Sequence, residues 1–207
     1  MTQQNDHIHY SPMSLAAHNC RDVAGLIYES APELFTLMFG AGAIPYLTDL
    51  IQGSQNRFSH QYIRVAALNH QVIGVAVLIS TDQLNHNVDY LDRLNLSHWL
   101  WLNLIESLMF SRVLQHDFPT GSFYIGNLAV AIASRNQGIG RQLLLNCIAE
   151  VVNNSEATTP IFIRVGVNNG RAQKLYESIG FQVVSTKAIG FIGMKVGSHL
   201  LSLCTGK

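Results

Sequence analysis

The stretch Leu128-Ala129-Val130-Ala131-Ile132-Ala133-Ser134-Arg135-Asn136-Gln137-Gly138-Ile139-Gly140-Arg141 decides the fold, because it joins a predicted strand to a predicted helix through a loop with two glycines. Glycine lets the backbone approach a ligand closely. The first turn of a helix presents unpaired N–H groups and a partial positive charge. The stretch therefore predicts a cradle for a phosphate group.

The charges around this loop also indicate an anion. No acidic residue occurs between Asp117 and Glu150, while Arg135 and Arg141 flank the start of the helix. A cation in the first turn opposes the helix dipole unless an anion is bound there. The nucleotide patterns GxxxxGK[ST] and GxGxxG are both absent, so a different phosphate ligand is expected.

A second motif follows the next predicted strand. It reads Asn169-Gly170-Arg171-Ala172-Gln173-Lys174-Leu175-Tyr176 and continues to Gly180-Phe181. Together with Arg135-x-x-Gly138-x-Gly140, this NxxAxxLYxxxGF pattern resembles the GNAT superfamily of acyl-CoA-dependent N-acyltransferases. The resemblance covers about residues 123–182, and the helices and hairpin before them agree with the family in order.

The resemblance implies acetyl-CoA as co-substrate and a cofactor-binding core at about residues 123–182. Strand residues would pair with the pantetheine arm through their backbone, loop residues would surround the pyrophosphate, and Asn169 would hydrogen-bond the arm. Asn169 would also suit the N-cap of a helix. The expected cofactor-binding residues are Leu128, Ala129, Val130, Arg135, Asn136, Gln137, Gly138, Ile139, Gly140, Arg141 and Asn169.

Tyr176 is the expected catalytic residue, because the resemblance places it near the cofactor's sulfur. Acyl transfer from a thioester expels a thiolate, which a nearby phenol can hydrogen-bond or protonate. The general base stays open. Several members of the superfamily carry a Glu on the strand before the loop, but the corresponding residue here, Asn127, cannot accept a proton. Water remains a candidate, as do four residues of the N-terminal half: Glu29, Glu33, His86 and Asp89.

The remaining pattern predicts one α+β domain (an α/β/α sandwich) over residues 9–207, after a disordered tail at 1–8. We expect a mixed, mostly antiparallel sheet that is splayed at the cofactor site, with a helical insertion at about 82–118 between the third and fourth strands. The predicted helices are 15–39, broken at Pro32, then 44–52, 138–152 and 170–178. The predicted strands are 8–13, 62–68, 71–79, 123–132, 161–167, 181–186 and 191–196, and the second and third are joined by a turn at Asn69-His70.

Composition limits the class of protein. The 207 residues are 48% hydrophobic and only 13% charged, with a net charge of zero and three widely spaced cysteines. A single cytoplasmic domain is expected, without a metal site, a signal peptide, a membrane span or a nucleic-acid surface. Residues 1–117 hold five arginines and ten acidic residues, and residues 118–207 hold the opposite excess. This asymmetry suggests a cation bound by the first part and an anion bound by the second.

The sequence thus predicts an N-acetyltransferase that moves an acetyl group to a primary amine by direct attack in a ternary complex. The alternative is a non-catalytic acyl-CoA-binding module of the same fold. This alternative is favoured because position 127 is Asn and not Glu. The acceptor, a small-molecule or peptide amine, stays unidentified. The apolar faces that carry Trp99 and Trp101 are expected to cover the acceptor side of the cleft or to form a homodimer contact.

Overall fold

The computed structural model describes residues 7–84, 118–155, 158–191 and 194–204. Its seven strands form one sheet in the order β1-β2-β3-β4-β5-β7-β6, and every neighbouring pair is antiparallel except β4 and β5. The strands are β1 His9–Pro12, β2 Ile63–Leu68, β3 Gln71–Ser80, β4 Phe123–Val130, β5 Pro160–Gly166, β6 Gln182–Phe191 and β7 Met194–Cys204. The predicted mixed, mostly antiparallel sheet is confirmed.

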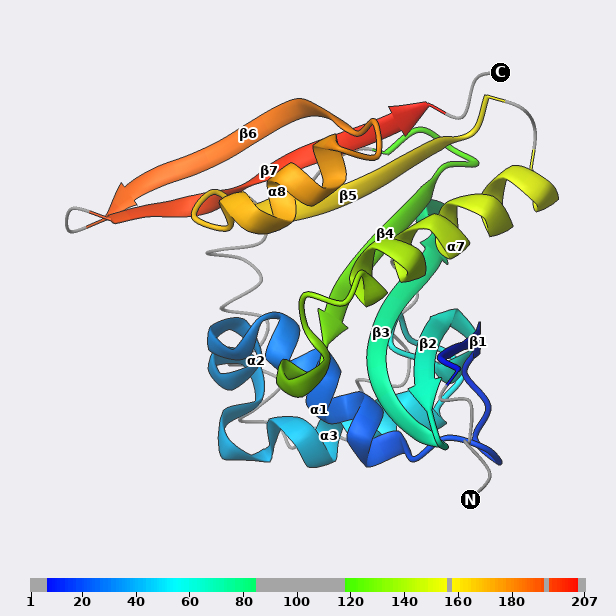
Figure 1. The fold of residues 1–207 in the computed structure, drawn as a ribbon. Helices are drawn as coiled ribbons and strands as arrows, with labels where there is room; N and C mark the ends of the chain where they lie inside the picture. Colours follow the sequence, from blue (N-terminus) through cyan, green and yellow to red (C-terminus); the bar gives the residue numbers. More distant parts are fainter. Residues whose placement is uncertain (1–6, 85–117, 156–157, 192–193, 205–207) are drawn as a thin grey trace.

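Helices cover both faces of this sheet (Figure 1). One face packs against α1 and α3 through buried strand residues such as Val65, Val75 and Val77. The other face packs against α7 and α8 through residues such as Ile125 and Ile163. Successive side chains of a strand point to opposite faces, so each buried strand contributes to both cores. The helices are α1 Cys20–Ser30, α2 Pro32–Phe39, α3 Ala43–Gln52, α7 Ile139–Asn154 and α8 Gly170–Glu177.

The first helix begins later than the sequence predicted. The Asn19 side chain accepts hydrogen bonds from the backbone N–H groups of Arg21 and Asp22, at 2.8 and 3.4 Å, so α1 starts at Cys20 and not at Leu15. Pro32 does not simply break the helix. It occupies the first turn of α2, where its missing N–H needs no partner.

The hairpin of β2 and β3 turns at Asn69-His70, as predicted. Both residues have positive φ angles, 49° and 67°, which is typical of a two-residue turn whose twist matches that of the strands.

The last two strands are longer than predicted, and the predicted boundary at Phe191 is wrong. Phe191 ends β6, and β7 runs from Met194 to Cys204 in register with both β5 and β6. The two backbones come very close at Gly197, where a Cβ atom would lie 2.2 Å from the Lys187 carbonyl oxygen. Pairing on both sides of β7, which no local pattern reveals, therefore sets its length.

Among the described residues, one helical stretch, Pro32–Gln52, is long and apolar enough to cross a membrane by length and composition alone, with a mean hydropathy of 1.5. The expectation that no such stretch exists is therefore wrong by this measure. Phe35, Leu47 and Leu50 of this stretch are buried in the core beside α1. Core helices pass the same test, so the stretch is weak evidence for a membrane span.

Two other predictions fall largely outside the described residues. The insertion separates β3 from β4, as expected, but its predicted helices and both tryptophans lie in the range 85–117. Residues 1–6 of the predicted tail are also outside the described part, whereas Ile8 packs against a small core cluster around Ile73 and Leu143.

The buried thiol of Cys147 should be unreactive in the folded protein. Burial raises its pKa to about 12, while the nearby Arg64 opposes this shift and Glu150 adds to it. A thiol reacts as the thiolate, which is scarce so far below its pKa. Mass spectrometry after iodoacetamide treatment at pH 8 should find the exposed Cys204 alkylated and Cys147 protected until the chain is unfolded. Equal labelling of both cysteines in the folded protein would contradict this packing.

Candidate functional site

The sheet opens between its two parallel strands. β4 and β5 are paired only from Phe123 to Ile125 and from Ile161 to Ile163, and beyond these residues the strands diverge (Figure 1). The edge of β4 from Gly126 to Val130 therefore faces a gap, although its other edge pairs with β3. Backbone N–H and C=O groups on such an edge can receive an extended ligand like an added strand.

A cavity of about 330 Å³ occupies this gap. Its walls come from both faces of the molecule: the junction of α1 and α2, the diverging ends of β4 and β5, and the first turns of α8. Of the predicted site residues, Leu128, Asn169 and Tyr176 line it. The cavity thus passes through the sheet, from the α7 and α8 face to the α1 and α2 face.

The predicted phosphate loop has the expected backbone geometry at the start of α7. Gly138 is the N-cap in the left-handed conformation, with φ of 79°, and Asn136 has φ of 68°. No side chain caps this helix start among the described residues, so the N–H groups of Ile139, Gly140 and Arg141 have no partner within the helix. A Cβ atom at Gly138 would meet nothing within 4 Å. The loop therefore leaves open space beside unpaired donors.

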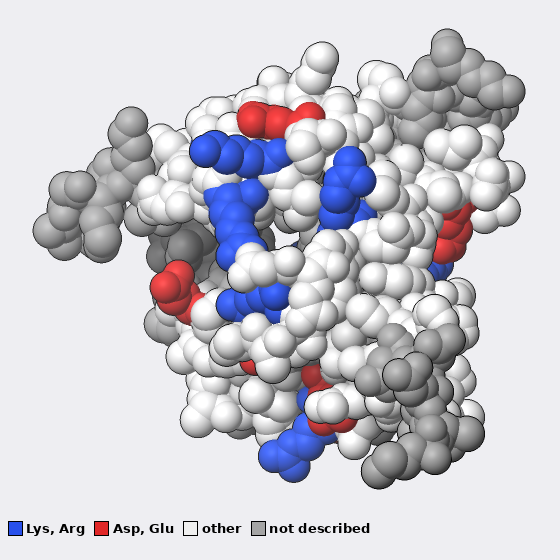
Figure 2. Space-filling model, viewed as in Figure 1, with Lys and Arg blue, Asp and Glu red and all other residues white. Residues whose placement is uncertain are grey.

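Basic side chains gather around the cleft. Figure 2 shows Lys and Arg side chains around a hollow between the α8 layer and the α7 layer. The exposed basic residues of these segments are Arg135, Arg141, Arg171 and Lys174. Arg171 at the start of α8 donates a hydrogen bond to the Asn136 side chain, which ties the two helix N-termini together across the cleft. Two positive helix ends and their arginines make this an anion-binding surface.

Arg135 has partners of its own within the protein. Its Nε donates to the Val130 carbonyl at 2.9 Å, and its guanidinium lies 3.2 Å from a Glu29 carboxylate oxygen. Arg135 thus braces the loop against α1, a contact between residues 106 positions apart. Its predicted role toward the cofactor remains a prediction.

A bulge in β4 lies at the centre of the cleft. Val75 of β3 pairs with Ala129 and Val77 with Gly126, so Asn127 and Leu128 together face Ala76. Asn127 has φ of 49°, and its side-chain amide donates to the Ser30 hydroxyl at 2.9 Å. Asn127, at the position where several members of the superfamily carry a Glu, therefore links the bulge to the end of α1 through this hydrogen bond.

The bulge predicts a difference between two substitutions of Asn127. Both Asn127→Ala and Asn127→Gly lose the hydrogen bond to Ser30, but only alanine is strained at this positive φ. Asn127→Ala should lower the free energy of unfolding by roughly 1 kcal/mol more than Asn127→Gly. Urea denaturation of both variants measures the difference, and equal stabilities would contradict the observed backbone conformation.

Asn169 and Tyr176 belong to α8. The Asn169 side-chain oxygen caps the helix by accepting from the Ala172 N–H at 3.1 Å, so its predicted structural role is confirmed. Tyr176 is 6% exposed, lines the cavity and packs near Phe181. Burial raises the pKa of its phenol far above the usual value, and the nearby Tyr124 raises it further. Tyr176 is therefore a neutral hydrogen-bond donor at any physiological pH.

No candidate base lies in the described wall of the cavity. Of the lining residues that the structure describes, none is Asp, Glu or His. Glu29 and Glu33 are exposed, and Glu29 is paired with Arg135. His86 and Asp89 lie outside the described residues. In addition, no group of three or more His, Cys, Asp or Glu that could hold a metal occurs among the described residues.

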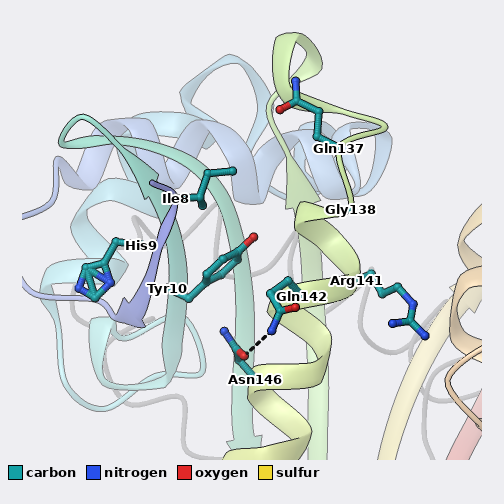
Figure 3. Close-up of a pocket in the computed structure, with 8 residues that line it drawn as sticks. All are labelled: Ile8, His9, Tyr10, Gln137, Gly138, Arg141, Gln142 and Asn146. Atoms are coloured by element: carbon teal, nitrogen blue, oxygen red, sulfur yellow. Dashed lines mark hydrogen bonds between the residues drawn. The ribbon is translucent and has the colours of Figure 1, made fainter. Parts of the chain in front are cut away.

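A second hollow lies on the other side of α7, between this helix and β1 (Figure 3). Its volume is about 710 Å³, and three of the predicted site residues line it: Gln137, Gly138 and Arg141. Tyr10, Gln142 and Asn146 line it as well, the last two joined by a 3.0 Å hydrogen bond. Figure 3 shows the Arg141 side chain extending from α7 on the side away from Tyr10. The larger hollow thus borders the same loop as the β4–β5 cleft, but its described lining includes neither the free edge of β4 nor Tyr176.

Several cavity residues were not identified from the sequence, among them Arg57, Arg164 and Ser198. The sequence does contain a signal for Arg164, since it is the one charged residue in the apolar stretch Ile161–Val165. Arg57 and Ser198 come from distant segments and carry no motif, so only the folded structure brings them together.

Comparison with known proteins agrees with this geometry. The Acetyltransferase (GNAT) family matches residues 27–181. An N-acetyltransferase from Staphylococcus aureus Mu50 is similar in structure, with a TM-score of 0.65 and 17% identity over 94% of this chain and all of that one. The ribosomal-protein-S18-alanine N-acetyltransferase of Escherichia coli has a TM-score of 0.57 and 14% identity over 97% of this chain and 96% of its own.

A third similar structure is that of yncA from Salmonella typhimurium with its cofactor acetyl-CoA, which has a TM-score of 0.57. It is 13% identical over 97% of this chain and 95% of its own. No curated protein sequence matches the chain. The likeness to these structures shows the shared fold, and the family match spans most of the sequence, including both motifs. The chain, with its splayed sheet and glycine loop, belongs to the Acetyltransferase (GNAT) family.

Proposed function

We propose that the protein is an enzyme that transfers an acetyl group from acetyl-CoA to a primary amine, by direct attack in a ternary complex. The observation that carries this proposal is the cavity between β4 and β5, which is lined by a free strand edge and a buried tyrosine, beside a basic loop that a hydrogen bond from Arg171 ties to α8. Acetyl-CoA supplies an activated thioester, and its reaction with an amine gives an amide and a free thiol.

The residues of the cleft fit the parts of that co-substrate. The N–H groups at the start of α7 and the nearby Arg141 and Arg171 would hold the pyrophosphate. The edge of β4 over Leu128, Ala129 and Val130 would pair with the pantetheine amides. Tyr176, which is buried, would then stand where negative charge develops on the leaving sulfur, and a hydrogen bond from a buried donor is strong.

The amine must lose a proton during the reaction. Asn127 cannot accept it, and the described wall offers no carboxylate or imidazole. We therefore assign this proton to water, with the acceptor entering from the α1 and α2 face. Proton exchange with solvent needs no strongly basic side chain if the amine binds in its neutral form.

The lack of a carboxylate or imidazole in the described cavity wall also favours one alternative, a module of this fold that binds acyl-CoA without turnover. A screen of acetyl-CoA consumption separates the two functions. Small amines, amino acids, aminoglycosides and peptide N-termini are tested, and mass spectrometry detects the acetylated product. Product from any class above the rate without enzyme supports the enzyme. Tight CoA binding by calorimetry without product from any amine would support the module.

A further inference from the structure

The end of the cavity that faces α1 and α2 carries a partly buried cation. Tyr124 of β4 is opposite Phe162 of β5, so Arg164, two residues further on, points to the same face as these aromatic rings. The alternate residues Ile163 and Val165 face α7 and α8. Arg164 lines the cavity. Its guanidinium is therefore on the α1 and α2 side of the sheet, from which the proposed function has the acceptor enter.

A second cation lies at the same end. Arg57 also lines the cavity, and its Cζ is 4.8 Å from the centre of the Phe58 ring. Burial lowers the pKa of the Arg164 guanidinium, the adjacent Tyr124 raises it, and Arg57 lowers it. A guanidinium stays charged at neutral pH nevertheless. Two like charges that share a partly buried site repel each other, so an anion between them would be stabilised.

Ser198 adds a polar group without a partner. It lies on β7 opposite Gly166, and the next residue on the same face, Leu200, is opposite Arg164. The Ser198 hydroxyl is buried, lines the cavity and has no hydrogen-bond partner among the described residues. A buried hydroxyl without a partner costs stability, and a bound ligand would satisfy it.

We propose that this end of the cavity binds a carboxylate of the acceptor, so that the acceptor is a small amino acid-like molecule with both an amine and a carboxylate. Guanidinium groups match the geometry of a carboxylate, and the serine hydroxyl can donate to it. The cavity of about 330 Å³ must also hold the reacting end of the co-substrate, so the part of the acceptor that enters it is small, as in an amino acid. This inference rests on the proposed acetyl transfer.

The test compares amines that differ only in the carboxylate. The probes are the twenty common L-amino acids, β-alanine and γ-aminobutyrate, each beside its carboxamide and at equal concentrations of neutral amine. For the preferred acceptor, kcat/KM of the acid should exceed that of the amide by roughly 10- to 100-fold, the loss expected when a hydrogen-bonded charge is removed. Equal rates for acids and amides, or faster acetylation of peptide N-termini, would overturn the inference.

Variants assign the preference to these residues. Arg164→Met keeps the length of the side chain but not its charge, and should bring the acid-to-amide ratio close to one while the Kd for CoA is unchanged. Arg57→Gln should lower the acid-to-amide ratio too. This second variant tests the assignment if Arg164→Met does not fold. The exposed Arg21 on α1 provides the control, since Arg21→Gln should keep the wild-type ratio. A full preference in folded variants of both cavity arginines would overturn the assignment.

A binding measurement tests the anion site independently of the proposed acetyl transfer. Calorimetry with CoA-loaded protein should show tighter binding of the acid than of the amide, whether or not any acetyl group is transferred. Absence of product with this binding preference would contradict the enzyme but support the anion site. Product formation with no preference for the acid would support the enzyme and contradict the anion site.

Discussion

Replacing Tyr176 by phenylalanine should lower kcat by about 100-fold, the usual effect of losing one donor that stabilises transition-state charge. The ring remains and can still pack near Phe181, so stability and the Kd for CoA should change little. Burial and the neighbouring Tyr124 hold the pKa of the Tyr176 phenol well above that of a thiol. The phenol is therefore suited to donate a hydrogen bond to the leaving thiolate, whereas complete proton transfer to sulfur would be unfavourable.

The same shift in pKa fixes the sign of the pH dependence. A raised pKa means that the donor form of Tyr176 persists throughout the neutral and mildly alkaline range. The rate kcat should consequently not fall between pH 7 and pH 10 through ionisation of this tyrosine. Single-turnover kinetics measure the chemical step directly, with Tyr62→Phe, a tyrosine packed against the α1 and α3 core, as the control. An unchanged chemical rate in Tyr176→Phe would leave Tyr176 as a packing residue only.

Valine at Gly138 should raise the Kd for CoA by on the order of 100-fold. Two effects combine: the side chain would fill the open space in front of the α7 N-terminus, and a β-branched residue is strained at φ of 79°. The strain alone also destabilises the fold, so a matched control is needed. Gly121 has φ of 76° and equally open space around its Cβ position, but lies in the turn before β4.

Comparison of the two valine variants separates the effects. Both should lower the melting temperature to a similar extent, because the backbone conformations are alike. Only Gly138→Val should weaken CoA binding in calorimetry. A folded Gly138→Val protein with wild-type affinity would exclude this loop as the pyrophosphate site, and an equal loss of affinity in Gly121→Val would attribute the effect to strain.

Local sequence signals predicted much of this structure. The glycines at 138 and 140 indicated the loop and the helix start, and the Asn69-His70 pair indicated the hairpin turn, because these residue types favour the backbone conformations that the turns need. Asn169 indicated a helix cap for the same reason. These features depend on a few adjacent residues, so a linear sequence reveals them.

Features that depend on distant contacts could not be predicted. The length of β7 depends on pairing with both β5 and β6, and the partner of Arg135 is Glu29 on α1. The charge asymmetry of the chain suggested a cation-binding N-terminal part, yet that part contributes Arg57 to the wall of the cavity. A count of charges along the sequence does not show which of them face a shared cavity.

The most direct test of the central claim is a crystal structure of the protein with CoA. The pyrophosphate oxygens should lie about 3 Å from the backbone nitrogens at Gly138, Gly140 and Arg141, at ordinary hydrogen-bond distances. The pantetheine arm should run along the free edge of β4, with its sulfur beside Tyr176. CoA bound instead in the larger groove between β1 and α7, with the β4–β5 cleft empty, would contradict the account.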